Sequence, residues 1–302
     1  MNQATMFLSQ LTILDHAYID DCGVVVGGSF NPDFIVGGDV DPVEQVVVDF
    51  STVKKDLKGI IDDKEIGFDH KLWFIEGYSQ GHYEEFVNEL EQPRIRITTQ
   101  SVYLDVPRNA VTIFEANDYS VEAVGKVLGK FVEGELKKKY PTVRVSCLNN
   151  IVAHTPTLDH TSVKPDVALF TYSHGLKDST SWGCNNIAHG HLSYVQIAPS
   201  NPDTMHLQET IANDLDGVVF VNKANVVAED DKQITLSYTT GRGLFFARYQ
   251  KDSNFIKVLE TETTIEHLVE WVRNRYETRL YDSGAKFLFV SEGLSKGALA
   301  AL

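Results

Sequence analysis

The stretch Cys184–His191, with the sequence CNNIAHGH, decides how the fold of this chain is interpreted. In a β-strand the side chains of residues i and i+2 leave the same face, so His189 and His191 can reach one ion. A third histidine, His174, lies upstream in the strand-like run FTYSH. Three neutral imidazoles with an open fourth position are typical of a catalytic zinc site, because a structural site would have a fourth protein ligand. The pattern therefore predicts that His174, His189 and His191 bind Zn2+, with Cys184 near the open position.

The same residues have a simpler interpretation. An isolated His-x-His pattern also occurs in surface loops that bind no metal. The cysteine before the pair and the third histidine upstream favour the metal site. Spacing alone does not separate the two interpretations.

Length and composition indicate a globular protein with room for two domains. The chain has 302 residues, of which 43% are hydrophobic and 23% are charged, and this length accommodates two domains of ordinary size. The formal net charge of −15 argues against a broad basic surface for nucleic acid or for an anionic membrane. An anionic small-molecule substrate stays compatible with this charge, because a local cluster of Arg and Lys is enough to bind it.

Signals for targeting and for disulfides are absent from the sequence. No run approaches the roughly 20 apolar residues that a membrane helix needs. The first residues, MNQATM, lack a basic region followed by an apolar core, so no signal peptide is expected. The three cysteines, Cys22, Cys147 and Cys184, are an odd and sparse set that does not suit a disulfide framework. These features predict a cytoplasmic protein with no membrane partner.

The first half of the chain has the pattern of a mixed α and β domain. Hydrophobic alternation and turn residues predict strands at 7–20, 33–41, 45–50, 94–99, 111–114 and 143–148. Apolar residues at helical spacing predict a helix that follows Ser51 as N-cap and ends near 62, and a second helix at 120–139. Asp41-Pro42 is expected to turn the second strand into the third. Residues 151–165 are expected to be a connector.

The second half has a similar pattern. Strands are predicted at 169–173, 192–197, 217–221, 233–238, 244–249 and 286–290, and a helix at 263–281. Thr263–Glu266 matches a capping box at the start of that helix. Gly241–Gly243 fits a phosphate-binding loop and equally a hairpin turn.

Landmarks in the two halves agree in order and spacing, which predicts a tandem duplication. Ser120–Glu122 and Thr264–Glu266 open the two long helices. Leu14–His16 aligns with Tyr172–His174, and Ser29–Asn31 aligns with His189–His191. In this alignment the first half keeps one zinc histidine, His16, and has lost two, so His16 is expected to pack inside its own domain. The predicted domains are residues 1–150 and 166–302.

Taken together, these residues resemble the 6-pyruvoyl-tetrahydropterin synthase family, which includes the bacterial 6-carboxy-tetrahydropterin synthases of queuosine biosynthesis. The most specific match is the cysteine followed by His-Gly-His in Cys184–His191. The other matching segments are Phe170–His174, Val46–Lys54, Phe68–Lys71, Thr263–Trp271 and Val290–Gly293, and together the matches cover about half of the chain.

The resemblance implies an α+β chain with two copies of the tunnelling fold, an antiparallel sheet with helices packed on one face, which assembles into a barrel. It implies zinc on His174, His189 and His191, and catalysis by Cys184 with Asp69 and His70. Glu292 would anchor the pterin, and Thr263 and Thr264 would line the pocket. Each role has a structural alternative: Asp69-His70 as a helix C-terminal pair, Thr263 as an N-cap, and Glu292 as a solvated turn residue.

The resemblance also implies a composite site. The zinc and cysteine residues lie in the second half, whereas Asp69-His70 lies in the first. In the family, the cysteine and the Asp-His pair of one site come from neighbouring subunits. Two specialised domains could therefore share one complete site, and alternating domains would favour a homo-oligomer, either a dimer or a tetramer.

The expected activity is that of a zinc-dependent lyase acting on 7,8-dihydroneopterin triphosphate. The expected product is 6-carboxy-5,6,7,8-tetrahydropterin or else the 6-pyruvoyl product. The alternative is a non-catalytic pterin- or purine-binding protein that keeps a structural zinc. The separation of Asp69-His70 from Cys184 distinguishes the two, because acid–base catalysis needs these groups within hydrogen-bond reach.

Overall fold

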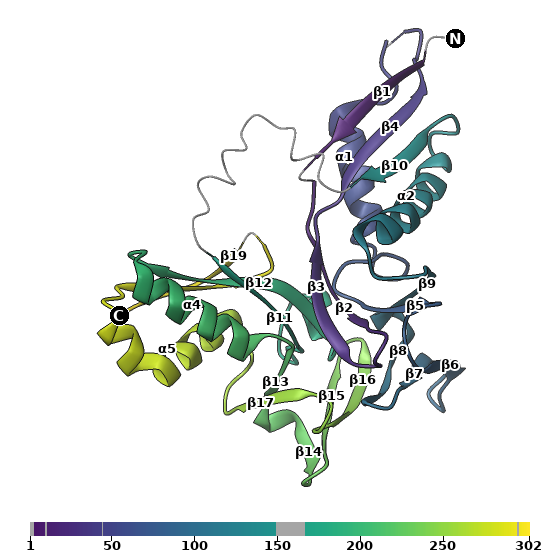
Figure 1. Cartoon of the computed structure of the whole chain (residues 1–302). Helices are drawn as coiled ribbons and strands as arrows, with labels where there is room; N and C mark the ends of the chain where they lie inside the picture. Colours follow the sequence, from purple (N-terminus) through teal and green to yellow (C-terminus); the bar gives the residue numbers. More distant parts are fainter. Residues whose placement is uncertain (1–2, 10, 44, 149–166, 295) are drawn as a thin grey trace.

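The computed structural model describes residues 3–9, 11–43, 45–148, 167–294 and 296–302, and the predicted connector at 151–165 lies outside them. The described residues form a mixed α+β protein with four sheets and four α-helices (Figure 1). None of these helices combines the length and the apolar composition needed to cross a membrane.

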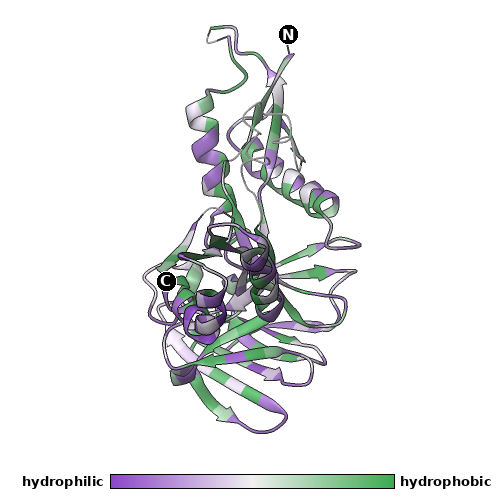
Figure 2. Cartoon of the chain, turned by 60° about the vertical axis from the view of Figure 1, so that its left-hand side comes forward, coloured by the Kyte–Doolittle hydropathy of each residue, from purple (hydrophilic) through white to green (hydrophobic). Residues whose placement is uncertain are grey.

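The N-terminal half contains a small sheet covered by two helices. Its strands are β1 (Gln3–Leu8), β4 (Asp33–Asp39) and β10 (Arg144–Leu148), all antiparallel, and its helices are α1 (Phe50–Ile61) and α2 (Val121–Lys137). Val53 and Leu57 of α1 and Leu128 and Val132 of α2 share one core with Phe34 of β4. Hydrophilic and hydrophobic residues alternate along the helices (Figure 2), so each helix can bury one face.

A second sheet of the N-terminal half positions residues near the junction with the other half. Its order is β3 (Val25–Phe30), β2 (Leu14–Ile19), β5 (Leu72–Glu76) and β9 (Val111–Glu115), with β5 parallel to both of its neighbours. Asp69 and His70 lie in the short connection that leads into β5. Because β5 is a central and largely buried strand, it gives this connection a fixed position.

The C-terminal half is organised around a six-stranded sheet. Its order is β17 (Phe255–Leu259), β13 (Val218–Asn222), β11 (Ala168–His174), β12 (His189–Ala198), β18 (Phe287–Glu292) and β19 (Lys296–Ala301). The helices α4 (Pro202–Leu215) and α5 (Ile265–Asp282) share a core with this sheet through residues such as Ile211, Leu268 and Val272. Strand β13 is parallel to β11 and β17.

The two halves meet in two places. Strand β16 (Gly243–Gln250) pairs with β8 (Val102–Pro107). This pairing joins strands of both halves into one six-stranded sheet. Its order is β14 (Val226–Glu229), β15 (Gln233–Thr240), β16, β8, β7 (Pro93–Thr98) and β6 (His82–Val87). Strand β3 also packs against β11 and β12. A Cβ on Gly27 would lie 2.0 Å from the carbonyl oxygen of Tyr172, so only glycine permits this approach.

Each half contains the same pair of hydrogen bonds between an aspartate segment and a strand. Asp69 accepts a hydrogen bond from the backbone N–H of Asp15, and Asp216 accepts one from that of Thr171. In return, the His70 N–H donates to the carbonyl oxygen of Asp15, and the Gly217 N–H donates to that of Thr171. Asp15 therefore stands in the N-terminal half where Thr171 stands in the C-terminal half.

This match corrects the predicted alignment of the two halves by two residues. His16 stands at the place of Tyr172 rather than at that of His174, and it lies opposite Gly28 as Tyr172 lies opposite His191. The places of His174, His189 and His191 are taken in the N-terminal half by Tyr18, Val26 and Gly28. In this correspondence His16 does not stand at the place of any of these three histidines.

Three local predictions in the first half are also wrong. Residues 45–50 form no strand, because the chain turns where the Asp41 N–H donates to the Val46 carbonyl oxygen. Helix α1 has Asp49 rather than Ser51 as its N-cap, since the Asp49 carboxylate accepts from the Thr52 N–H at 3.0 Å. The predicted strand at 7–20 is two strands, because β1 ends at Leu8 and β2 begins at Leu14.

Two features of the second half also differ from the prediction. Helix α4 was not predicted, although Asn201 caps it and Pro202 occupies its first turn. The predicted capping box at Thr263–Glu266 is absent, because Thr264 is the N-cap of α5 and its side chain makes no capping hydrogen bond.

Candidate metal centre

Three histidines converge where β11 ends and β12 begins. His174 lies opposite His189 in the ladder, and His191 follows on the same face. The ligand atoms of the trio all lie within 4.8 Å of one another, and the Nε2 atoms of His174 and His191 are 3.2 Å apart. Each histidine is at most 1% exposed. The histidines predicted from the sequence are thus brought together in a buried group that could hold a metal ion.

Backbone carbonyls orient two of the three rings. Nδ1 of His174 lies 2.8 Å from the carbonyl oxygen of Thr263, and Nδ1 of His189 lies 2.9 Å from that of Asn186. Each Nδ1–H can donate to its carbonyl, which leaves Nε2 free to bind an ion. Nε2 of His189 is buried and makes no hydrogen bond of normal geometry among the described residues. A buried imidazole nitrogen of this kind fits the donor set of a metal site.

Burial sets the protonation state of His174 and His191. It holds the pKa of His174 and of His191 well below the ordinary range, and the nearby His189 lowers both pKa values further. Both imidazoles are therefore neutral near pH 7, which is the form that binds a metal. Imidazole ligands suit zinc and several other transition metals, so the donor set of three histidines fits this class of ion.

The Asp69–His70 pair lies next to the trio. Oδ2 of Asp69 is 2.6 Å from Nδ1 of His70. The centroid of the His70 ring is 5.6 Å from that of His189 and 6.3 Å from that of His191. His70 has a φ of 53°, which is uncommon for a residue with a Cβ and is often found at functional sites.

Cys184 lies in the short 3-10 turn Gly183–Asn185, which packs against His70. A Cβ on Gly183 would lie 2.5 Å from the Cβ of His70, so this contact requires glycine. Asn186 donates from Nδ2 to the carbonyl oxygens of His70 and Ala110, at 3.2 and 2.9 Å. A loop of the C-terminal half is therefore hydrogen-bonded to the N-terminal half beside the Asp69–His70 pair.

The hairpin turn Gly241–Gly243 supports the same loop. The Arg242 guanidinium lies 3.6 Å from the centroid of the Trp182 ring. It also donates to the carbonyl oxygens of Trp182 and Asn109, each at 3.1 Å. Of the two interpretations of this turn, the hairpin between β15 and β16 is confirmed. Its arginine ties the Cys184 loop to the N-terminal half.

The Cys184 thiol and the His70 imidazole influence each other's charge. Burial raises the pKa of the thiol, but interactions with His189 and His70 outweigh this and lower the pKa to about 5. Burial also disfavours the charged form of His70, but Asp69 and Cys184 hold the pKa of His70 above its ordinary range. Near pH 7 the pair is therefore a thiolate and an imidazolium, which places a base and an acid side by side.

Glu292 points its carboxylate toward the trio from the end of β18. Its Oε1 lies 3.9 Å from Nε2 of His191, and its Oε2 lies 3.1 Å from Nζ of Lys296. The Glu292 side chain is 13% exposed, so it lies at the boundary between the buried histidines and solvent. This position differs from that of a freely solvated turn residue.

The two threonines predicted to line the pocket have different surroundings. Thr263 is buried, and its Oγ1 lies 3.2 Å from Nδ1 of His174. Thr264 is the N-cap of α5, and its hydroxyl lies 3.3 Å from Nδ1 of His267. Thr263 is thus in contact with the trio, whereas the hydroxyl of Thr264 is engaged elsewhere.

One carboxylate next to the trio was missed as a site residue. Oδ1 of Asp15 lies 3.4 Å from Nδ1 of His191, and Asp15 is 5% exposed. The sequence held a signal for it, because β2 is otherwise apolar or aromatic apart from His16, and a carboxylate in a buried strand needs a partner. The sequence does not reveal that the partner is a histidine of the other half.

His16 packs away from the trio. Its ring stacks on Trp73 with the centroids 3.5 Å apart, and its Nε2 lies 2.6 Å from the Tyr119 hydroxyl. Burial lowers the pKa of His16 to about 4. The expectation that His16 packs inside the N-terminal half is confirmed.

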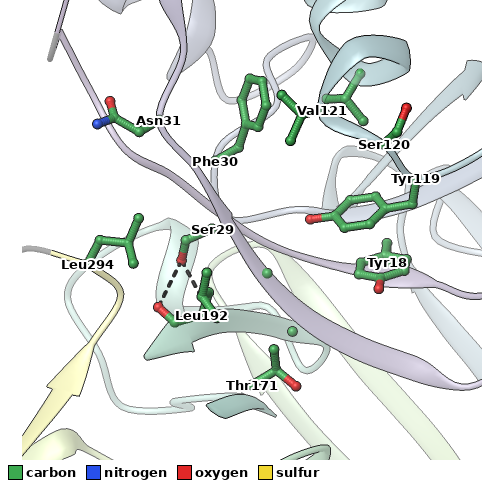
Figure 3. Close-up of a pocket in the computed structure, with 13 residues that line it drawn as sticks. Tyr18, Ser29, Phe30, Asn31, Tyr119, Ser120, Val121, Thr171, Leu192 and Leu294 are labelled. Atoms are coloured by element: carbon green, nitrogen blue, oxygen red, sulfur yellow. Dashed lines mark hydrogen bonds between the residues drawn. The ribbon is translucent and has the colours of Figure 1, made fainter. Parts of the chain in front are cut away.

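A hollow of about 530 Å³ lies beside the junction of the two halves (Figure 3). Tyr18, Phe30, Tyr119 and Leu192 lie on its walls, with Ser29 between them. Within the described part of the chain, its lining includes none of the site residues predicted from the sequence. The hollow is therefore a feature separate from the histidine trio.

No family model, no curated protein and no solved structure matches this chain.

Proposed function

We propose that this protein is a zinc-dependent lyase that converts 7,8-dihydroneopterin triphosphate to 6-carboxy-5,6,7,8-tetrahydropterin or to the 6-pyruvoyl product. The observation that carries the proposal is the position of Asp69 and His70 of one half against Cys184 of the other, beside the buried trio. A binding protein with a structural zinc does not need an ionised thiol paired with an imidazolium. The arrangement therefore favours catalysis over binding alone.

We also propose that residues 1–150 and 166–302 are tandem copies of a tunnelling-fold domain. Each half has a parallel run of three strands, β2-β5-β9 and β11-β13-β17, and a pair of helices. In the sheet β14-β15-β16-β8-β7-β6, three consecutive strands of one half and three of the other follow in opposite order from the central β16–β8 pair. This two-fold pattern is what two copies joined edge to edge would produce.

The proposed metal centre uses His174, His189 and His191 as the three protein ligands of zinc, with a fourth position open to substrate. Bound there, zinc would act as a Lewis acid that lowers the pKa of the substrate's side-chain hydroxyls. The residues around it bind the substrate and move its protons.

Cys184 is the proposed base. As a thiolate it can take a proton from a substrate carbon that carries a hydroxyl group. His70 is the proposed acid that returns a proton. Asp69 accepts a hydrogen bond from the Nδ1–H of His70, so Nε2 is the nitrogen that can exchange a proton with substrate or thiol.

Glu292 is the proposed anchor for the pterin ring. A carboxylate can accept two parallel hydrogen bonds, here from the ring N–H and the exocyclic amino group of a pterin. Lys296 lies 3.1 Å from Oε2 and competes for one of these oxygens. Thr263 is proposed to line the inner end of the same pocket.

The composite site is proposed to need only one chain. Asp69 and His70 lie against Cys184 of the same chain, so a second chain does not have to supply the acid–base pair. We propose that two or four chains associate to close the barrel rather than to complete the site. Molar-mass measurement by light scattering tests this assembly.

Metal analysis followed by product identification tests the function. The purified protein should contain about one zinc per chain, and incubation with 7,8-dihydroneopterin triphosphate should release triphosphate and form one of the two tetrahydropterins. Cys184→Ala should keep the metal and form no product. Zinc and pterin binding without product would favour the binding protein, and a wild-type protein with neither metal nor product would contradict the proposal.

A further inference from the structure

Asp15 is a buried carboxylate of the N-terminal half that faces a proposed metal ligand of the C-terminal half. Its Oδ1 lies 3.4 Å from Nδ1 of His191. That nitrogen is buried and has no hydrogen bond within the described residues. The Nδ1 atoms of His174 and His189 instead face backbone carbonyls. His191 is therefore the one member of the trio whose Nδ1 atom faces a carboxylate.

Ser29 holds the Asp15 carboxylate beside His191. The Ser29 hydroxyl donates to Oδ1 of Asp15 at 2.6 Å and accepts from the backbone N–H of Leu192 at 3.0 Å. Figure 3 shows Ser29 reaching from β3 to Leu192, the residue that follows the ligand. The carboxylate is thus fixed relative to the backbone that carries His191.

The space around the carboxylate is also restricted. A Cβ on Gly293 would lie 2.7 Å from Oδ1 of Asp15, so the turn after Glu292 passes directly over the carboxylate. A buried carboxylate enclosed in this way keeps few alternative positions, which is the condition for a residue that orients a neighbour.

The backbone of Asp15 is tied to the acid–base pair. Its N–H donates to Oδ1 of Asp69 at 3.0 Å, and its carbonyl oxygen accepts from the His70 N–H at 2.6 Å. Asp15 therefore contacts the proposed metal ligand through its side chain and the proposed acid through its backbone.

We infer that Asp15 is a positioning residue that fixes the ring and raises the ligand strength of His191 for a divalent transition metal. The inference rests on the proposed metal centre. A metal-bound histidine commonly donates its other ring N–H to a carboxylate or carbonyl, and a carboxylate makes the ligand nitrogen more basic. Asp15 supplies this carboxylate from the opposite half, so the N-terminal half contributes to metal affinity although it carries no metal ligand itself.

The test is the affinity of Asp15→Asn for Zn2+, measured by competition with a chelator. The variant should bind zinc about 10- to 100-fold more weakly than the wild type, as for other outer ligands. Asp216→Asn is a control for the same chemical change, because Asp216 accepts from the backbone N–H of Thr171, the counterpart of Asp15, is not one of the residues that face the trio, and should leave the affinity unchanged. Equal zinc affinity in Asp15→Asn and wild type overturns the inference.

A spectroscopic measurement separates ligand tuning from a purely structural role. The visible spectrum of the Co2+-loaded protein should change in Asp15→Asn, because the basicity of one imidazole ligand changes. An unchanged spectrum of the fully loaded variant would show that Asp15 only stabilises the fold. If Asp15→Asn does not fold, Ser29→Ala is the deciding variant, because it removes the hydrogen bond from Ser29 to Asp15 and keeps the carboxylate. Weaker zinc binding by Ser29→Ala then supports the inference, and unchanged binding overturns it.

These outcomes are distinct from failure of the proposed function. A wild-type protein that binds no divalent metal contradicts the metal centre itself. A wild-type protein that binds metal with the same affinity as Asp15→Asn contradicts only the role of Asp15. Neither measurement depends on turnover.

Discussion

Asn186 donates a hydrogen bond from its side-chain Nδ2 to the backbone carbonyl oxygen of His70, at 3.2 Å. This bond joins the loop that carries Cys184 in one half to the Asp69–His70 pair of the other. A side-chain amide that bonds to a carbonyl oxygen fixes a distance without adding charge. The bond therefore holds the Cys184 loop beside His70 without placing a further charge next to the thiol and the imidazole.

Cys184 should be the most reactive cysteine of the metal-free protein at pH 6. Its pKa is lowered to about 5, so about 90% of it is thiolate at pH 6, compared with about 0.1% for a thiol of pKa near 9. The lower nucleophilicity of an acidic thiolate reduces this advantage to about tenfold. Iodoacetamide labelling followed by peptide mass spectrometry measures the rates.

The other two cysteines are internal controls for this labelling. Nearby Asp20 and Asp21 raise the pKa of the exposed Cys22, and burial raises that of Cys147. His70→Ala should move the labelling profile of Cys184 to higher pH, because it removes a group that lowers the thiol pKa. Labelling of Cys22 before Cys184 at pH 6 would contradict the thiolate assignment.

His189→Ala should remove the bound metal. The substitution takes one of three ligands from a buried site, and zinc affinity should fall by more than the roughly 100-fold upper range for outer ligands. His206→Ala is the control, because His206 is exposed on α4. Zinc content after gel filtration in a weak chelator gives the comparison, and a full equivalent of zinc in His189→Ala would remove His189 from the ligand set.

Asp69→Asn should reduce turnover and spare the metal. The amide keeps the shape of the side chain but no longer favours the charged His70, so the pKa of His70 should fall toward its ordinary value. General acid–base catalysis contributes about 10²- to 10⁴-fold, and kcat should fall within that range. The zinc content should match that of wild type. Wild-type kcat in this variant would assign the pair to a structural role at the end of α1.

The local part of the site was predictable from the sequence, and the long-range part was not. His189 and His191 share a face because of strand geometry, which a two-residue spacing already expresses. The contact of Asp15 with His191 depends on how β3 packs against β12, and no local pattern encodes that packing. The two-residue shift from the predicted alignment has the same origin, because it follows from hydrogen bonds between distant segments, Asp15–Asp69 and Thr171–Asp216.

The incorrect secondary structure has physical causes in particular residues. Val46–Val48 have strong strand propensity, but Gln45 has a positive φ of 57° in a tight turn, and Asp49 then starts a helix. Helix α4 escaped detection because its inner face carries polar side chains. Thr204 and Gln208 are buried there, and Gln208 accepts a hydrogen bond from the Ile197 N–H at 2.9 Å. Polar residues with such partners erase the apolar stripe on which helix prediction depends.

Gly27→Ala should destabilise the junction of the two halves. The new Cβ would lie 2.0 Å from the carbonyl oxygen of Tyr172 and 2.9 Å from the backbone nitrogen of His191. Both are main-chain atoms, so a strand has to move, and the free energy of unfolding should fall by about 3 kcal/mol or more. Because one of these atoms belongs to His191, zinc affinity should fall as well.

Gly59→Ala is the matched control for this effect. Gly59 lies within α1, and a Cβ there would meet nothing within 4 Å. Alanine in a helix interior is favoured over glycine by about 0.5–1 kcal/mol, so this variant should be slightly more stable than wild type. Urea unfolding followed by circular dichroism compares the two variants. If Gly27→Ala unfolds at the wild-type midpoint and binds zinc normally, β3 does not pack closely against β12, and the N-terminal half does not support the histidine strand.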